Sequence, residues 1–217
     1  MEKFKQGFTL IELLMSMMII GIIATLLMVA INNSMPNREM VLFKKAYNVA
    51  GNAIYNLIND DNLYPYTTID ERMGFRNIDE VGYKDLFHRY DSKFCTLMAA
   101  IMNVQGDYNC SNSATLDNGG TFTTVDGMTW VLPLSTFEGD AGNWQVIHVD
   151  VNGPNEGQNC SHGASGCTKP DRFSFRVRYD GKMLVTEGSL EQYYLSNTDI
   201  KKDYQDYQDY LSSKKKK

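Results

Sequence analysis

The strongest constraint on this chain is an apolar run near its amino terminus. Residues Phe8–Ile31 form 24 consecutive positions in which Glu12 is the only charged side chain. As an α-helix this run is about 36 Å long, and the hydrocarbon core of a bilayer is about 30 Å thick. Lys3 and Lys5 precede the run, and basic residues beside a span favour the cytoplasmic side. The sequence therefore predicts one membrane-spanning helix, with its amino terminus in the cytoplasm and the following chain outside.

Two ordinary kinds of segment compete with this interpretation. A secretory signal peptide has an apolar run of about 7 to 15 residues and a small-x-small cleavage site, whereas here Met28 stands two positions before Ala30. A plain uncleaved anchor is the other alternative. Neither explains Glu12, because a charge costs up to about 2.5 to 3.5 kcal/mol at the centre of a span and less near its edge. We expect a partner that compensates this charge.

The string GFTLIE at residues 7–12, followed by the apolar run, resembles the amino-terminal motif of type IV prepilins and type II secretion pseudopilins. The resemblance implies that prepilin peptidase cuts after Gly7 and methylates the new amino terminus at Phe8. It implies that Glu12, with Thr9 in the same assembly motif, meets the amino terminus of a neighbouring subunit. An ammonium group and a carboxylate, both costly in lipid, neutralise each other when subunits pack. One departure is that the first proline is Pro36, which places any bend at residues 32–36.

The same resemblance implies a location and a set of partners. Lipid of the bacterial inner membrane holds the subunit first, and an inner-membrane assembly platform then joins it to copies of itself and other pilin-like subunits. The product is a periplasmic or cell-surface filament, with no cofactor. The sequence does not distinguish a type IV pilus from a secretion pseudopilus, or a major subunit from a minor one. The length of 217 residues slightly favours a minor or specialised subunit. The alternatives are a membrane-anchored extracytoplasmic binding domain that does not polymerise, and a secreted enzyme released from a signal peptide.

The fold class that the pattern predicts is α+β, with a long amino-terminal helix packed on a carboxyl-terminal antiparallel sheet, as in pilin-like folds. Apolar residues at steps of three and four from Phe43 to Ile58 indicate an amphipathic helix. Residues 83–102 are also predicted to be helical. Strands are expected at four segments rich in β-branched or aromatic residues, which are 129–134, 144–151, 173–179 and 183–186.

These elements divide the chain into six segments. They are a cytoplasmic leader at 1–7, a transmembrane and assembly helix at 8–31, an amphipathic continuation at 32–59, a variable connection at 60–128, the antiparallel sheet at 129–190 and a tail at 191–217. In the tail, a three-residue repeat would place Tyr204, Tyr207 and Tyr210 near one edge if this segment were helical. They would either pack on the domain or stay exposed.

Four cysteines follow the apolar run, and an even number outside the cytoplasm favours disulfides. Sequence order favours Cys95 with Cys110 and Cys160 with Cys167, out of three possible pairings. Free thiols are one alternative. A metal site at Cys160, His162 and Cys167 is another, but it lacks a C-x-x-C pair and a fourth ligand.

Asp150, Asn152 and Asp171 are weak calcium candidates, because their side chains offer oxygen ligands and some pseudopilins bind calcium in a loop of this region. Asp or Asn beside Gly and Pro is more often ordinary turn chemistry. No metal site is therefore predicted.

Charge and motifs exclude other classes of function. The net charge is −5, and without the four lysines at 214–217 the count is 17 basic against 26 acidic residues, or −9. Such an acidic body does not favour nucleic acid, which proteins bind through clustered Lys and Arg. The chain contains no H-E-x-x-H, G-x-S-x-G, Walker A or G-x-G-x-x-G motif. We therefore expect a protein that is not an enzyme.

Overall fold

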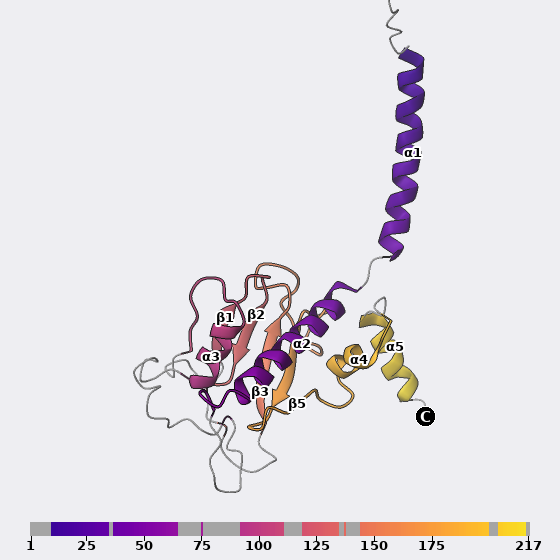
Figure 1. Cartoon of the computed structure of the whole chain (residues 1–217). Coiled ribbons are helices and arrows are strands. Elements are labelled where there is room, and N and C mark those ends of the chain that lie inside the picture. The colour runs from indigo at the N-terminus through magenta and orange to yellow at the C-terminus, as the bar shows by residue number, and fades with distance from the viewer. Residues whose placement is uncertain are drawn as a thin grey trace, which may run out of the picture. The chain divides into compact units, whose positions relative to one another are not determined.

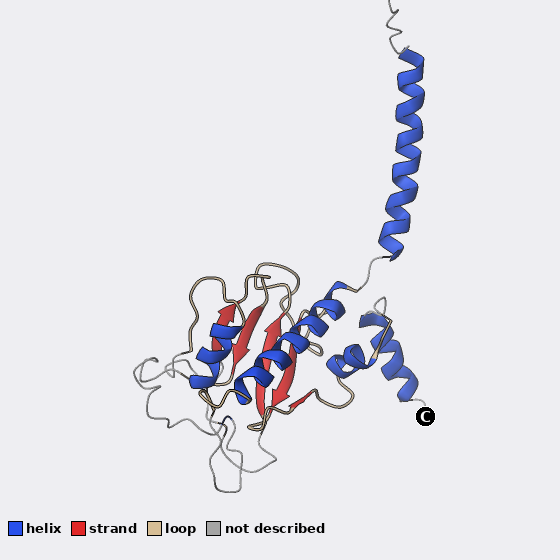
Figure 2. Cartoon of the chain, in the orientation of Figure 1, coloured by secondary structure: helices blue, strands red, loops and turns tan. Residues whose placement is uncertain are grey.

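The computed structural model describes residues 10–34, 37–64, 75, 92–110, 119–134, 137, 144–199 and 204–215. The chain forms two compact units, 1–36 and 37–217. The first holds helix α1, and the second combines four helices with an antiparallel sheet among the described residues (Figures 1 and 2). The predicted α+β class is confirmed.

Helix α1 spans Leu10–Ser34. Its residues Leu10–Leu27 are long and apolar enough to cross a membrane, and none of them is buried in the structure. The hydroxyls of Ser16 and Thr25 donate to carbonyls one turn earlier, at Glu12 and Gly21, so these polar groups are satisfied within the helix. A helix that is apolar on all sides requires lipid or other helices around it.

Helix α2 spans Arg38–Ile58 and begins at a defined cap. The Asn37 side chain accepts a hydrogen bond from the Met40 backbone N–H at 2.9 Å, as a helix N-cap does. Helix α1 ends at Ser34 and α2 begins at Arg38. The predicted bend at residues 32–36 falls partly on residues 35 and 36, which lie outside the described residues. The buried face of α2 has the predicted apolar spacing and includes Met40, Phe43, Ala46, Ala50, Ala53, Ile54 and Leu57.

The sheet is a simple antiparallel meander of five strands in the order β1 to β5. Its strands are β1 (Gly120–Thr123), β2 (Thr129–Leu132), β3 (Gln145–Asp150), β4 (Arg172–Val177) and β5 (Met183–Leu184). The last four lie where strands were predicted, though they are shorter. Strand β1 was not predicted, because four residues including a glycine carry little periodic signal.

Helices α2 and α3 (Lys93–Ile101) lie on one face of this sheet (Figure 1). Aromatic rings of α2 pack against aromatic rings of β4. The ring centres of Phe43 and Phe173 are 4.7 Å apart, and those of Tyr47 and Phe175 are 5.4 Å apart. Helix α3 occupies the last part of the predicted helix 83–102, whose residues 83–91 lie outside the described residues. The core thus lies between the helices and the inward-facing residues of the strands.

Hydrogen bonds cover the open side of β1 and one position on the open side of β4, beyond the short strand β5. At β1, Asn109 and Thr121 exchange two backbone hydrogen bonds of 2.9 and 2.8 Å, and Gln105 N–H donates to the Thr123 carbonyl at 2.7 Å. At β4, Glu191 from helix α4 (Leu190–Ser196) accepts the Ser174 N–H at 3.1 Å. Free strand edges invite pairing with other chains, so this sheet is protected from strand addition at these positions.

Candidate functional site

The predicted processing residues Gly7 and Phe8 and the predicted assembly residue Thr9 lie outside the described residues. The predicted assembly residue Glu12 lies in the first turn of α1, and its side chain is exposed. A carboxylate is favoured there, because the first turn of a helix carries partial positive charge on its free N–H groups. Glu12 is also four positions after Phe8, the first residue that the predicted cleavage leaves.

Two ion pairs hold the start of α2 to the loop that joins β3 to β4. Arg38 pairs with Glu156 at 2.9 Å on the surface, and Lys169 pairs with Glu39 at 3.1 Å. Glu39 is 7% exposed, and it lies in the first turn of α2, where negative charge is stabilising. The first turn of the second unit is therefore anchored to this loop.

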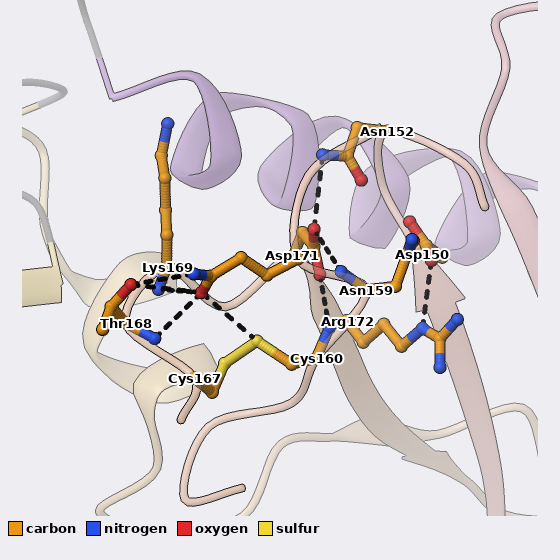
Figure 3. The surroundings of a disulfide bond; sticks show 10 residues. Asp150, Asn152, Asn159, Cys160, Cys167, Thr168, Lys169, Asp171 and Arg172 are labelled. Carbon is orange, nitrogen blue, oxygen red and sulfur yellow. Dashed lines mark hydrogen bonds and ion pairs between the residues drawn. A yellow bond between two sulfur atoms is a disulfide. The ribbon is translucent and has the colours of Figure 1, made fainter. Parts of the chain in front are cut away.

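A disulfide and a buried carboxylate shape the same loop (Figure 3). Cys160 is bonded to Cys167, which is the pairing that sequence order favours. Asp171 is 1% exposed. Its Oδ1 accepts the Cys160 N–H at 2.8 Å and its Oδ2 accepts the Asn159 N–H at 2.9 Å. Asp171 therefore satisfies the backbone of the loop next to the disulfide.

The three calcium candidates have different neighbours in the structure. Asp171 accepts the loop N–H groups, and the Asn152 side-chain amide also points to it at 3.4 Å. Asp150 instead pairs with Arg172 at 3.0 Å. Asp150 Oδ1 and Asn152 Oδ1 are buried and accept no hydrogen bond from the described chain. Ordered water commonly satisfies buried oxygens of this kind in proteins. Among the described residues, no three acidic, cysteine or histidine side chains gather as a metal site.

The alternative metal site at Cys160, His162 and Cys167 does not form. Both cysteines are used in the disulfide, and a metal-binding cysteine must be a thiolate. The His162 ring instead packs against Tyr204 and Tyr207, with ring centres 5.6 and 5.1 Å away. These tyrosines belong to helix α5 (Tyr204–Lys214), so the tail packs on the disulfide loop.

The second disulfide joins Cys95 of α3 to Cys110, again the pairing that sequence order favours. Both residues are buried. The Ser92 N–H donates to the Cys110 carbonyl at 2.8 Å, and the Ser92 side chain caps α3. This bridge fixes the segment that covers the edge of β1. The sequence alone did not indicate that role, because it depends on a strand that was not predicted.

Comparison with known families identifies the amino-terminal segment. Residues 3–28 match the family described as the prokaryotic N-terminal methylation motif, which is the prepilin-type cleavage and methylation motif of type IV pilins and pseudopilins. Comparison with curated proteins and with solved structures gives no match. The motif and the apolar helix α1 are the features of a prepilin-type protein. More particularly, the motif supports a type IV pilin-like or pseudopilin substrate of prepilin peptidase.

Proposed function

We propose that this chain is a structural subunit of a type IV pilus or of a type II secretion-like pseudopilus. Prepilin peptidase cleaves it after Gly7 and methylates the amine of Phe8, and the processed subunit enters a helical filament. The observation that carries the proposal is the methylation motif at residues 3–28, continuous with a helix whose residues Leu10–Leu27 are wholly uncovered in the structure.

The uncovered helix supports assembly on physical grounds. Lipid covers its apolar surface before assembly, while the subunit is held in the bacterial inner membrane with its domain outside. In a filament, helices of neighbouring subunits replace the lipid through van der Waals packing. An inner-membrane assembly platform makes this exchange, and the filament then extends into the periplasm or onto the cell surface. Members of families with this motif are structural subunits rather than enzymes.

Glu12 supplies the specific interaction in this proposal. Cleavage after Gly7 creates a new ammonium group at Phe8, and Glu12 of one subunit pairs with that group on a neighbour. In surroundings of low dielectric constant, opposite charges attract more strongly than in water. Desolvation cancels much of this energy. The pair therefore contributes mainly to the axial position that each subunit takes.

Intact-mass measurement of the protein from its native membrane tests the proposal. The mature chain should have 210 residues, which is 217 minus the seven of the leader, and it should carry one methyl group on Phe8. Gly7→Leu should remain as the unprocessed precursor. Gly21→Ala is the matched control, because a methyl group at Gly21 contacts nothing within the structure, and it should mature normally. An intact leader in the wild type would indicate a plain membrane anchor and contradict the proposal.

A further inference from the structure

A shallow hollow of about 250 Å³ lies beside the first two strands, on a part of the molecule that the processing motif does not explain. Its lining exposes polar and apolar surface in similar amounts. Six of the seven lining residues carry a hydroxyl, amide or carboxylate group, and these are Asp107, Tyr108, Asn109, Thr121, Thr123 and Thr129. Pockets for drug-sized ligands hold about 300 to 1,000 Å³. The volume of the hollow lies below this range, so the hollow suits a ligand of about one small polar ring.

The strand pattern explains why these side chains gather. Along β1, Phe122 is buried in the core while Thr121 and Thr123 are half-exposed, so the threonines lie on the opposite face of the sheet. Thr129 of β2 pairs with Thr123, and their hydroxyl oxygens are 3.1 Å apart. Asn109 pairs with Thr121 in antiparallel register, which puts both side chains on the same face.

The segment that completes the hollow is held in place. It is tied to β1 at Gln105 and Asn109 by backbone hydrogen bonds of 2.7 to 2.9 Å. Directly after it, Cys110 is bonded to the buried Cys95. A site that is rigid before binding loses less conformational entropy when a ligand arrives.

Two side chains of this segment have polar groups that form no hydrogen bond with the described chain. Tyr108 is 46% exposed. Within the described part of the chain, neither the Asp107 carboxylate nor the Tyr108 hydroxyl has a hydrogen-bond partner. A tyrosine ring offers a flat, electron-rich face to C–H groups. A carboxylate, an amide and hydroxyls around it offer the acceptors and donors that sugar hydroxyls require.

From this juxtaposition we propose that the hollow binds one neutral sugar ring, as the terminal unit of a glycan. The sugar ring stacks on Tyr108, and its hydroxyls donate to Asp107 and exchange hydrogen bonds with Asn109 and the threonines. A neutral sugar is favoured over an acidic one, because the carboxylate in the lining and the net charge of −5 repel anions. This activity is separate from processing and assembly.

The test is saturation-transfer NMR on the full chain in lipid nanodiscs, since sugar-headed detergents would compete. The probes are the methyl glycosides of glucose, galactose, mannose and N-acetylglucosamine. We expect saturation transfer to at least one of them, and Tyr108→Ala should weaken its binding about tenfold or more. Tyr55→Ala is the matched control, because Tyr55 is a 68% exposed tyrosine on α2, and it should bind as the wild type does.

A second variant keeps the test independent of folding defects. Thr121→Val preserves the size and β-branched shape of the side chain but removes a hydroxyl, so it should fold normally and bind more weakly. The proposal is overturned if the wild type transfers saturation to none of the four glycosides. It is also overturned if transfer is unchanged in folded Tyr108→Ala or in Thr121→Val.

Discussion

The Asp171 carboxylate accepts the backbone N–H of Cys160 at 2.8 Å, and this bond connects a buried acid to the disulfide that closes its loop. The loop folds tightly around the acid. Gly157 has φ of +73°, and a side chain there would clash with Asp171 Oδ2. The conformation of this loop therefore depends on a side chain at position 171 with two oxygens that can each accept a backbone N–H.

Asp171→Asn should destabilise the protein, because an amide has one oxygen where two N–H groups need acceptors. One buried donor, of Asn159 or Cys160, is then left unpaired and faces an NH₂ group. We expect the free energy of unfolding to fall by about 1 to 3 kcal/mol, as measured by urea unfolding of the full chain at neutral pH.

The control for this change is Asp150→Asn. Asp150 is also buried, but it pairs with Arg172, whose side chain is about half exposed. Its Oδ2 accepts from Arg172 Nε at 3.0 Å, and an asparagine oxygen can still accept that hydrogen bond. Because no backbone N–H loses its acceptor, the change should cost less than about 1 kcal/mol. An equal effect of the two substitutions would mean that charge alone, and not the two backbone acceptors of Asp171, stabilises the loop.

Elements with a periodic signal were predictable from the sequence, and elements held by distant contacts were not. The apolar spacing from Phe43 to Ile58 indicated α2, and alternating β-branched and aromatic residues indicated β2 to β5. Strand β1 has only four residues and depends on its pairing with β2. Helices α4 and α5 were not predicted either, because the first is short and the second carries a polar tyrosine repeat.

The same division applies to the candidate sites. The motif at residues 7–12 could be recognised because its residues are adjacent in sequence. The role of Asp171 could not be predicted, since its partners Asn159 and Cys160 lie 12 and 11 residues earlier and reach it through glycine turns. The hollow at Tyr108 was equally hidden, because it is assembled from a loop and two strands, one of which was not predicted.

Tyr207 fixes the carboxyl-terminal helix to the domain. Its ring is 2% exposed, and its hydroxyl donates to the Gly188 carbonyl at 2.7 Å. Tyr207→Phe should cost about 1 kcal/mol through the lost hydrogen bond. Tyr207→Ala leaves a cavity and should cost about 3 to 5 kcal/mol in local stability. Hydrogen exchange of the α5 amides is the measurement, and both variants should exchange faster than the wild type.

Tyr210→Ala provides the comparison on the same helix, since Tyr210 is partly exposed. Its ring centre lies 5.5 Å from that of Tyr193 and 4.9 Å from Lys214 Nζ. Its effect on α5 exchange should be clearly smaller than that of Tyr207→Ala. Unchanged exchange in Tyr207→Ala would show that α5 is not anchored through this side chain.

The turn between β4 and β5 should make stability depend on acid pH. Hydrogen bonds from Arg178 lower the pKa of Asp180, and the Lys182 N–H adds to this effect. A carboxyl group with a lowered folded-state pKa contributes stability above its unfolded pKa, and this contribution is lost as pH falls through the folded-state pKa. We expect Asp180→Asn to cost about 0.5 to 1 kcal/mol at neutral pH.

This difference should shrink as the pH falls below the ordinary Asp pKa of about 3.9. It should disappear once the pH is below the lowered folded-state pKa, where wild-type Asp180 is itself protonated. Urea unfolding of the wild type and of Asp180→Asn across this range measures it. A difference that stays constant with pH would mean that the substitution acts through the geometry of the turn and not through the Arg178 pair.

Glu12→Ala should leave membrane insertion and cleavage intact. A neutral residue makes the segment more apolar, so the helix should enter the membrane at least as well as before. The domain of residues 37–217 is a separate compact unit, so its folding should not change. Intact mass of the membrane fraction should therefore show mature, methylated protein at the wild-type amount.

Assembly is the step at which Glu12→Ala should fail. Apolar packing tolerates sliding of one helix along another, whereas a carboxylate opposite a neighbour's Phe8 ammonium favours a single axial position. Without that pair, subunits lose the interaction that sets their register, and desolvated charge at Phe8 is left uncompensated. We expect few or no filaments containing the variant, as counted by quantitative immunoblotting of sheared filaments.

Thr9→Ala is the control and should be milder, because it removes no charge. If Glu12→Ala subunits enter filaments at the wild-type level, register is set by packing alone and the pairing of Glu12 with Phe8 is wrong.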